Sequence, residues 1–385
     1  FAMAALVEAL RGAGRGRFLL AGVLFGLLVH TYPSSRAAPF LLPPFLLAEI
    51  GWSRESWRRA APGLLIFFAA AGCIAAPMLL HYLHHPADFN NPHRIVSVFS
   101  PGLGPGEASA HLRHNIVATL LMFHVRGDAN WRHNISGAPM LDPVTGALFL
   151  LGILGVIAVL VLDWRRPASS KALVTGPRRA ASAVLLLSWI PVMLLPNLLS
   201  VEGVPHGLRS AGVLPAVMLL AGLGAAAIFE RLRRGGRRVA SAAGPGFIAV
   251  FIGLAAMSGH RVLAWGGHPE VFRDHDGAYR AAARALLAAP AGAERFVVAN
   301  GSGYEVHGWP AEAACYRFEM RTSPPVLLGP KDAARLALGG RTAYVALIAA
   351  DPKVVEVIRT LNPGATLTEI HAPGVASGSP VYRIN

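Results

Sequence analysis

The sequence predicts a mostly α protein, in which a multi-span transmembrane helical bundle is followed by a small extracytoplasmic α/β domain. Three observations predict this fold class. Apolar runs long enough to cross a bilayer recur along residues 1–259. The loops between them alternate between arginine-rich segments and segments rich in His, Asn, Asp and Pro. The chain is 54% hydrophobic and only 15% charged, which is unusual for a soluble globular domain.

About seven apolar segments are expected to span the membrane, because each approaches the roughly 20 residues with which a helix crosses about 30 Å of hydrocarbon. In chain order they are residues 18–32, 37–50, 64–83, 144–162, 181–199, 213–229 and 239–257. The second segment is short and contains Pro39, Pro43 and Pro44. We interpret it as a span, because only then do all the basic loops fall on one side of the membrane.

Four basic clusters set the predicted orientation, since basic loops remain in the cytoplasm. The clusters are Arg11, Arg15 and Arg17; Arg54, Arg58 and Arg59; Arg165, Arg166, Lys171, Arg178 and Arg179; and Arg231, Arg233, Arg234, Arg237 and Arg238. The segment 32–36, the long loop 83–143, the loop 200–212 and everything after Gly259 then lie on the extracytoplasmic side. The sequence therefore predicts a multi-pass protein of the cell inner (plasma) membrane.

The net charge of +14 is explained largely by this topology. Sixteen of the 35 Lys and Arg residues belong to the four cytoplasmic clusters, where they act as topology signals. No stacking aromatic residues accompany these arginines, so nucleic-acid binding is not expected. The lipid bilayer is the partner that the charge pattern predicts.

The composition changes after residue 259, and the domain 260–385 is expected to form its own hydrophobic core. Helix-like stretches at 277–288, 331–338 and 353–361 alternate with β-like runs at 295–299, 342–348, 366–370 and 381–384. Turn signals such as Asn362-Pro363-Gly364 lie between them. The sequence Asn300-Gly301-Ser302-Gly303 follows a predicted strand but matches no phosphate-binding motif, so we interpret it as a strand-end turn.

Polar residues collect at the expected extracytoplasmic surface, in the segments 30–36, 81–143 and 205–209. A transporter or proton pump keeps ionisable groups near the bilayer midplane, and the expected spans hold few of them. This distribution favours a site at the membrane surface. His81, His84 and His85 have the i, i+3, i+4 spacing that lets one helical face hold a metal ion. No acidic residue has a matching ligand spacing, so we predict no metal site.

Four motifs occur in an order and spacing that resembles a known family. They are GVLFGLLVHTYPSSR at 22–36, RIVSVF at 94–99, GDANWRHN at 127–134 leading into PMLDP at 139–143, and PHGLR at 205–209. Together they resemble bacterial relatives of the dolichyl-phosphate-mannose protein mannosyltransferases and the lipid A aminoarabinose transferases, which are GT-C-type glycosyltransferases. The resemblance covers residues 22–224. It implies a GT-C-like bundle and transfer of a sugar from a polyprenyl-phosphate donor to a lipid, glycan or protein acceptor.

The family's catalytic carboxylate precedes the segments seen here. We therefore expect it to belong to an N-terminal portion that this chain lacks.

The chemistry of a polyprenyl-phosphate donor points to particular residue types. Arginines at span ends can pair with a phosphate at headgroup depth, and a fixed cation stabilises the charge that grows on a leaving phosphate. The candidate substrate or phosphate-binding residues are Tyr32, Arg36, Arg94, Arg132, His133, Asn134 and Arg209. The candidate bases are Asp128 and His206. No cofactor is required, although a divalent metal is compatible with the chemistry.

Two other functions stay open. The protein can be a non-enzymatic membrane scaffold or sensor whose extracytoplasmic domain binds a ligand, or a lipid or polysaccharide transporter. A scaffold predicts that the segments around Arg94, Asp128 and His206 are unrelated in space. An enzyme predicts that these segments converge.

Overall fold

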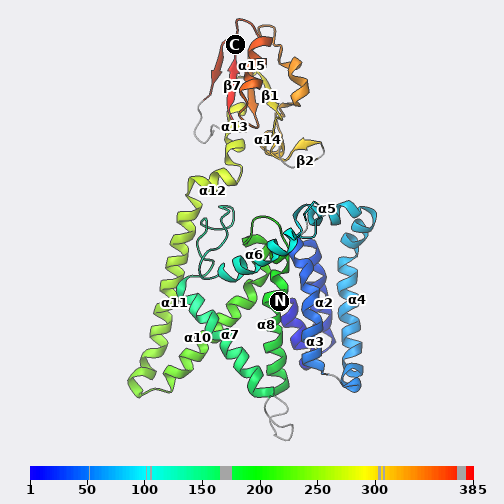
Figure 1. The fold of residues 1–385 in the computed structure, drawn as a ribbon, viewed down its shortest axis with the longest axis vertical. Helices are drawn as coiled ribbons and strands as arrows, with labels where there is room; N and C mark the ends of the chain where they lie inside the picture. The colour runs from blue at the N-terminus through cyan, green and yellow to red at the C-terminus, as the bar shows by residue number, and fades with distance from the viewer. Residues whose placement is uncertain are drawn as a thin grey trace. The chain divides into compact units, whose positions relative to one another are not determined.

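The computed structural model describes residues 1–51, 53–100, 102–104, 106–164, 176–301, 305–306, 308–370 and 379–385. The chain divides into two compact units, Phe1–Ser258 and Gly259–Asn385. The first unit is helical and the second contains a mixed sheet, as Figure 1 shows. Each unit is described by itself below.

The helical unit contains helices of very different length. They are α1 (Ala2–Glu8), the π-helical turn η1 (Ala9–Ala13), α2 (Arg15–Leu27), η2 (Leu28–His30), η3 (Pro33–Leu41), α3 (Leu42–Ile50), α4 (Arg54–His84), α5 (Pro86–Val96), α6 (Glu107–Leu121), α7 (Pro143–Trp164), α8 (Gly176–Leu198), α9 (Gly207–Ser210), η5 (Ala211–Val213), α10 (Leu214–Arg233) and α11 (Arg237–Gly266). Helix α11 continues past Ser258 into the second unit.

Among the described residues, five helical segments are long and apolar enough to cross a membrane. They are Arg54–His84, Pro143–Leu162, Arg179–Leu198, Gly207–Arg233 and Arg237–Gly266. These five correspond to the last five predicted spans. The first two predicted spans form shorter helices instead. The 13-residue α2 gives way to 3-10 turns near Pro33, and the segment 37–50 is divided between η3 and α3, with Pro39 inside η3 and a proline in the first turn of α3.

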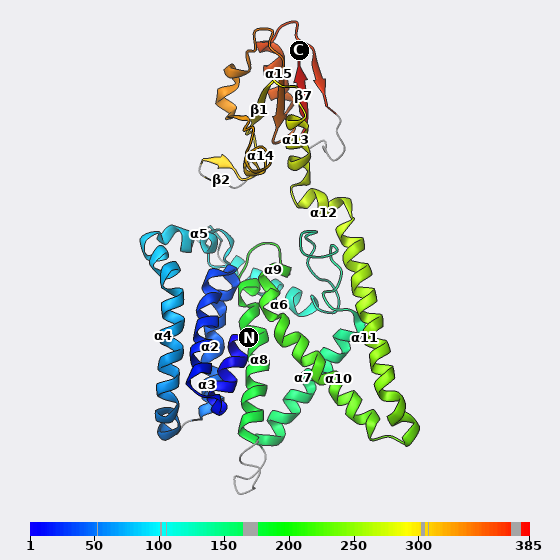
Figure 2. The same cartoon turned by 180° about the vertical axis from the view of Figure 1, so that it is seen from behind.

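Glycines allow two helix pairs to approach closely, and Figures 1 and 2 show both pairs side by side. A Cβ atom on Gly22 would lie 2.3 Å from the Phe67 carbonyl oxygen of α4. A Cβ atom on Gly152 of α7 would lie 1.9 Å from the Leu220 carbonyl oxygen of α10. Small residues at helix crossings are typical of membrane bundles, where backbones gain contact area by approaching each other.

A charged pair lies inside the helical unit, within a segment that the sequence assigned to a span. Glu49 is at the end of α3, and its carboxylate accepts hydrogen bonds from Arg11 Nε and Nη2, each at 2.9 Å. Arg11 Nη2 also donates to Ser182 Oγ of α8 at 2.9 Å. The pair therefore joins α3, η1 and α8. Its bidentate geometry is the strong form of an Arg–carboxylate contact.

The long polar segment between α4 and α7 contains two helices, α5 and α6, that the sequence did not predict. Both are more polar than the spans, with residues such as Asp88 and His93 in α5 and His111 and His114 in α6. After α5 the chain pairs with the segment that follows α8. The Val98 amide donates to the Leu199 carbonyl at 2.9 Å, and the Val201 amide donates to the Val96 carbonyl at 2.8 Å.

The second unit is built on a five-stranded sheet in the order β4-β1-β5-β7-β6. The strands are β1 (Glu294–Val298), β4 (Val326–Leu328), β5 (Ala343–Leu347), β6 (Leu367–Glu369) and β7 (Val381–Ile384). Strand β1 is parallel to β4 and β5, whereas β7 is antiparallel to β5 and β6. A separate hairpin pairs β2 (Glu305–Val306) with β3 (Trp309–Pro310).

Helices α12 (Pro269–Asp274), α13 (Gly277–Leu287), α14 (Ala313–Glu319) and α15 (Pro352–Leu361) and the 3-10 helix η6 (Pro330–Leu336) complete the second unit. One hydrophobic core joins α13 and α14 to strands β1 and β5, and it includes the fully buried Leu286 and Tyr316. All four predicted strands lie within one or two residues of β1, β5, β6 and β7. The predicted helix 331–338 is a 3-10 helix, which Pro330 begins.

Asn300 closes the turn after β1. Its side chain donates to the Ala349 carbonyl at 2.8 Å and accepts from the Ala349 amide at 3.0 Å. Ser302 and Gly303 of the predicted turn lie outside the described residues.

Candidate functional site

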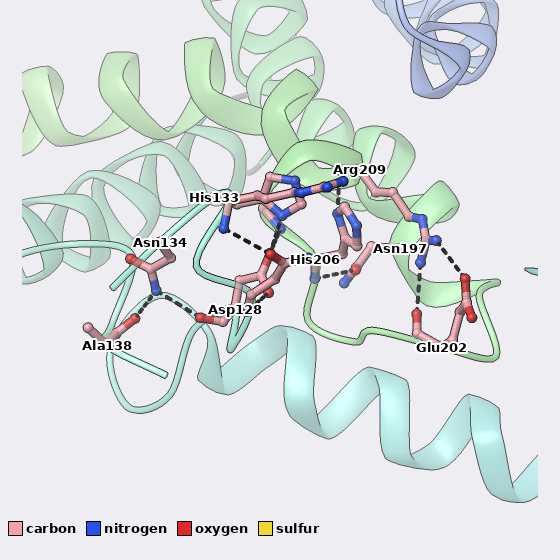
Figure 3. Close-up of polar contacts among 11 residues, drawn as sticks. Asp128, His133, Asn134, Ala138, Asn197, Glu202, His206 and Arg209 are labelled. Atoms are coloured by element: carbon pink, nitrogen blue, oxygen red, sulfur yellow. Dashed lines mark hydrogen bonds and ion pairs between the residues drawn. The ribbon is translucent and has the colours of Figure 1, made fainter. Parts of the chain in front are cut away.

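A buried carboxylate joins two polar loops of the helical unit (Figure 3). Asp128 lies after α6, and its side chain is only 3% exposed. Asp128 Oδ1 accepts from the Asn130 amide at 2.8 Å, and Oδ2 accepts from the Gly207 amide at 2.7 Å and from His133 Nδ1 at 2.9 Å. Residues 128 and 207 are 79 positions apart in the chain. The carboxylate therefore ties the motif at 127–134 to the motif at 205–209.

The loop that carries Asp128 is closed by its own hydrogen bonds. Asn134 Nδ2 donates to the Asp128 carbonyl at 3.2 Å and to the Ala138 carbonyl at 2.6 Å. The Gly137 amide donates to the Asp128 carbonyl at 2.8 Å. A Cβ atom on Gly127 would lie 2.4 Å from the Ala138 carbonyl oxygen, so only glycine fits there without movement. Asn134 thus shapes the loop from within.

The imidazole rings of His133 and His206 lie next to each other beside the Asp128 carboxylate. The centroids of the His133 and His206 rings are 4.5 Å apart. His206 precedes α9, its amide donates to Asn197 Oδ1 at 2.9 Å, and its Nδ1 accepts from the Arg209 amide at 3.3 Å. The pKa of His206 is lowered to about 4, chiefly by burial and also by the nearby Arg209 and His133, against the opposing effect of Asp128. The His206 ring is therefore neutral at neutral pH.

Arg209 holds the loop that follows α8. Its Nη1 donates to Ser200 Oγ at 2.6 Å and to the Glu202 carbonyl at 2.7 Å, and its Nη2 lies 3.6 Å from the Glu202 carboxylate. The Glu202 side chain is 65% exposed. The Arg209 guanidinium is thus positioned by neutral acceptors, and its charge has a solvated partner.

The three polar motifs meet in this region. The residues that follow α5 belong to the motif at 94–99, and Ser97 among them forms an isolated β-bridge with Ser200. Arg94 itself lies in α5, and its side chain is outside the described part of the structure. Ser200 also accepts a hydrogen bond from Arg209, and Gly207 donates to Asp128, so the segments around residues 97, 128 and 206 are connected in turn.

Buried polar side chains support this layer from α6 and α8. Asn197 is fully buried, and its Nδ2 donates to Thr119 Oγ1 at 2.7 Å while its Oδ1 holds His206. Asn115 Nδ2 donates to the Leu198 and Ser200 carbonyls at 2.8 and 2.6 Å. Neither asparagine is among the site residues predicted from the sequence. Their signal was an isolated asparagine within or beside an apolar run, which indicates an internal hydrogen bond.

The remaining predicted site residues have different neighbours. Arg36 lies against α4 and α5, where Nη2 donates to the Tyr82 hydroxyl at 2.8 Å and the guanidinium carbon is 4.5 Å from the centre of the Phe89 ring. The Arg132 amide donates to Asn130 Oδ1 at 2.9 Å, and the residue is exposed. The predicted set is therefore divided between a cluster at Asp128 and a separate contact at Arg36.

Tyr32 lines a cavity of about 350 Å³ that lies mostly between apolar side chains. Leu208 and Gly212 form part of its wall beside α9, and Trp189 and Met193 of α8 form another part. The Trp189 indole donates to the Gly212 carbonyl at 2.9 Å, which fixes the ring at the cavity. Leu208 connects the cavity to the motif that carries His206 and Arg209.

The two candidate bases, Asp128 and His206, have different surroundings. The Asp128 carboxylate is buried, and its oxygens accept three N–H groups, which block its approach to a substrate. It is suited to positioning His133 and Gly207, not to general base catalysis. His206 has a pKa of about 4, which makes it a weak base.

Metal-ligating residue types also occur together here. Asp128, His133 and His206 form a group that could hold a metal ion, with one donor atom from each residue within 4.8 Å of the others. The histidines with helical spacing behave differently. His81 Nε2 is 2.9 Å from Asp88 Oδ2, and the His81 and His85 rings are 4.7 Å apart, at an exposed position.

The chain matches no model of a protein family, and it has no match among curated proteins or solved structures. In the part of the chain that the structure describes, five helices are long and apolar enough to cross a membrane, and this length and composition indicate a membrane protein. Any more specific function is argued from the residues of the site.

Proposed function

We propose that the protein is an integral membrane glycosyltransferase that moves a sugar from a polyprenyl-phosphate donor to an acceptor on the extracytoplasmic side. The observation that carries the proposal is the connection of three sequence motifs: the buried Asp128 carboxylate joins the motif at 127–134 to the motif at 205–209, and Ser97 of the motif at 94–99 pairs with Ser200, which Arg209 also contacts. A scaffold whose helices only anchor a domain has no need to bring these polar loops together with buried hydrogen bonds. Burying polar groups is costly, and function is one reason to retain them.

The cluster is assigned to the phosphate of the donor. When the glycosidic bond breaks, the bonding electrons leave with the phosphate oxygen, and a fixed cation lowers the energy of that charge. Arg209 supplies a guanidinium whose position is set by Ser200 and the Glu202 carbonyl. The general base of the reaction is not assigned to Asp128 or His206, for the reasons given above.

The apolar cavity supports a lipid-linked donor. Its volume of about 350 Å³ accommodates part of an isoprenoid chain, and its lining is apolar apart from groups such as Tyr32 and Thr31. Leu208 lies in the cavity wall and is the neighbour of Arg209 in the chain. A chain bound in the cavity would bring the attached phosphate to the end of α9, beside the polar loops.

Arginine substitutions test the phosphate assignment. Arg209→Lys retains the charge and loses the planar fork, so transfer from a radiolabelled polyprenyl-phosphate sugar in membranes should fall by about tenfold to a hundredfold. Arg234→Lys is the matched control, because Arg234 is an exposed residue that follows α10 in a predicted cytoplasmic cluster. Protein amount and melting temperature are measured for both variants.

Three outcomes decide the proposal. A loss confined to Arg209→Lys at normal protein amount supports it. Equal loss in both variants would show that arginines at the membrane surface act through insertion, and would remove the phosphate assignment. Wild-type membranes that bind a polyprenyl phosphate without transferring a sugar to any lipid, glycan or protein acceptor would favour a sensor or a transporter.

A further inference from the structure

The loop cluster at Asp128 contains the donor types that zinc prefers. A carboxylate oxygen of Asp128 and one ring nitrogen each of His133 and His206 lie within 4.8 Å of one another. Two imidazoles and one carboxylate are the protein ligands of a common class of zinc site, which keeps a further position open. We propose that Asp128, His133 and His206 bind a single Zn²⁺ ion. Metal binding is a property of these three residues and stands whether or not the protein transfers sugars.

Only a small movement separates the His133 and Asp128 donor atoms from the spacing of zinc ligands, and the His206 donor lies within 4.8 Å of both. His133 Nδ1 and Asp128 Oδ2 are 2.9 Å apart and share the proton of the ring. Donor atoms in a tetrahedral zinc shell are about 3.3 Å apart, as follows from bond lengths near 2.0 Å. An ion can therefore replace the shared proton when the two atoms separate by a few tenths of an ångström, and the ring proton is then carried by His133 Nε2. The His206 ring completes the set from the opposite loop.

Binding costs His206 a single weak contact. Its Nδ1 accepts the Arg209 amide at 3.3 Å, which is long for a hydrogen bond. If Nδ1 binds the ion, this bond is displaced. If Nε2 binds the ion, Nδ1 carries the proton and can no longer accept. Either arrangement leaves the amide of His206 on Asn197 Oδ1.

Neighbouring groups hydrogen-bond the donor residues and fix their orientation, as they do around the ligands of zinc proteins. The Asn130 and Gly207 amides orient the two oxygens of Asp128. Asn197 fixes the His206 backbone and is itself held by Thr119. A Cβ atom on Gly207 would lie 3.0 Å from His133 Cβ and 3.4 Å from Asp128 Oδ2, so this glycine lets the two loops approach. The donors are thus positioned before any ion arrives.

The donor chemistry selects zinc over magnesium. Magnesium requires a nearly octahedral shell of oxygen atoms, whereas this cluster offers two nitrogens and one carboxylate. Imidazole suits zinc and cobalt, which adopt similar four- or five-coordinate geometries. The proposal therefore predicts that Co²⁺ replaces Zn²⁺ and that Mg²⁺ does not.

The test uses the full chain purified in detergent without a polyhistidine tag and treated with a chelator. Equilibrium dialysis against ZnCl₂ should give one tightly bound Zn²⁺ per chain, and excess MgCl₂ should not displace it. CoCl₂ should give visible absorption bands of four- or five-coordinate cobalt with nitrogen ligands, which zinc then abolishes. The cobalt spectrum reports the number and type of the metal ligands in the wild-type protein. This test therefore does not depend on whether a variant folds.

Variants locate the site. His133→Gln and His206→Gln should each weaken zinc binding by roughly a hundredfold or more. Even the loss of a group that only hydrogen-bonds a ligand lowers metal affinity by about tenfold to a hundredfold. The combined change of His81, His84 and His85 to Gln removes three histidines at the exposed end of α4 and should leave the tight ion in place. The absence of tight zinc and of a cobalt spectrum in the wild type would overturn the proposal. Zinc that is retained by the His133 and His206 variants and lost from the α4 variant would overturn it as well.

Discussion

Two His–carboxylate pairs in the helical unit have the same separation and different surroundings. In each pair the histidine nitrogen and the carboxylate oxygen are 2.9 Å apart. The His81 and Asp88 side chains are 47% and 58% exposed, whereas those of His133 and Asp128 are 16% and 3% exposed. Water competes for the first pair and screens it. Little water reaches the second, so its atoms must be satisfied by the protein.

The pairs also differ in what they connect. His81 and Asp88 are seven positions apart, where α4 ends and α5 begins. Asp128 additionally accepts the Gly207 amide from a loop that precedes α10. The exposed pair can form within one corner of the chain, while the buried pair depends on how α7, α8 and α10 are packed. Two pairs with the same separation are therefore expected to contribute very differently to the free energy of unfolding.

The largest expected change in stability tests whether the buried pair depends on the packing of α7 against α10. Gly152→Leu would place side-chain atoms against the Leu220 carbonyl, because even a Cβ atom would lie 1.9 Å from its oxygen. We expect the free energy of unfolding in detergent to fall by about 2 to 4 kcal/mol. Helices α7 and α10 would separate, and with them the loops that carry Asp128 and Gly207.

Gly155→Leu is the control on the same helix. Gly155 is exposed, and no atom lies within 4 Å of a Cβ atom built there. Its unfolding free energy should stay within about 0.5 kcal/mol of the wild type. Equal destabilisation by the two substitutions would show that α7 and α10 do not pack at Gly152.

The second prediction separates the two carboxylates directly. Both oxygens of Asp128 accept a backbone N–H, one from Asn130 and one from Gly207. In Asp128→Asn, the NH₂ group replaces one oxygen and must face one of these two N–H donors. Loss of bonds to a buried charge should lower the unfolding free energy by about 2 to 4 kcal/mol. Asp88→Asn, measured by the same denaturant titration, should change it by about 0.5 kcal/mol or less. Comparable values would mean that burial does not distinguish the pairs.

The five long apolar helices and four of the strands could be predicted from sequence because each has a strong local pattern. Apolar runs such as 144–162 and 239–257 exceed what a soluble helix exposes, and the short runs at 295–299 and 381–384, which combine β-branched and aromatic residues, are typical of strands. Helices α5 and α6 lack such a pattern, since their stability depends on neighbours. Strand β4 is three residues long and depends on pairing with β1, so its local sequence does not predict it.

The residues of the site were easier to find than their roles. Asp128 and His206 were singled out as rare polar residues in an apolar chain, and the structure places both in the cluster. The sequence could not show that the Gly207 amide binds Asp128, because the two are 79 positions apart. That bond is what makes the carboxylate a positioning group. Likewise Arg36 has the residue type of a phosphate ligand, but its aromatic neighbours Tyr82 and Phe89 come from other helices.

A third prediction concerns Asn197, whose side chain holds the His206 backbone in place. Asn197→Ala removes an acceptor from the His206 amide and a donor to Thr119, leaving two buried groups without their partner. The unfolding free energy should fall by about 1 to 3 kcal/mol. Ser109→Ala removes an exposed hydrogen bond to the Gly106 carbonyl and should have little effect. A loss in Ser109→Ala as large as that in Asn197→Ala would contradict the assigned difference in burial.

The smallest expected effect concerns the contact at Arg36, which lies beside the exposed pair on α4 and α5. Arg36→Leu removes the hydrogen bond to the Tyr82 hydroxyl and the stacking on Phe89, and should cost about 0.5 to 1 kcal/mol at this partly exposed position. Arg59→Leu is the control, since Arg59 makes an i, i+4 pair with Glu55 in which both side chains are 75% exposed. Raising the salt concentration should abolish the small effect of Arg59→Leu and leave most of that of Arg36→Leu, because the aromatic rings shield the guanidinium from ions. If salt removed both effects equally, Arg36 would act as an ordinary surface charge, and the aromatic contact would contribute nothing to the stability of α4 and α5.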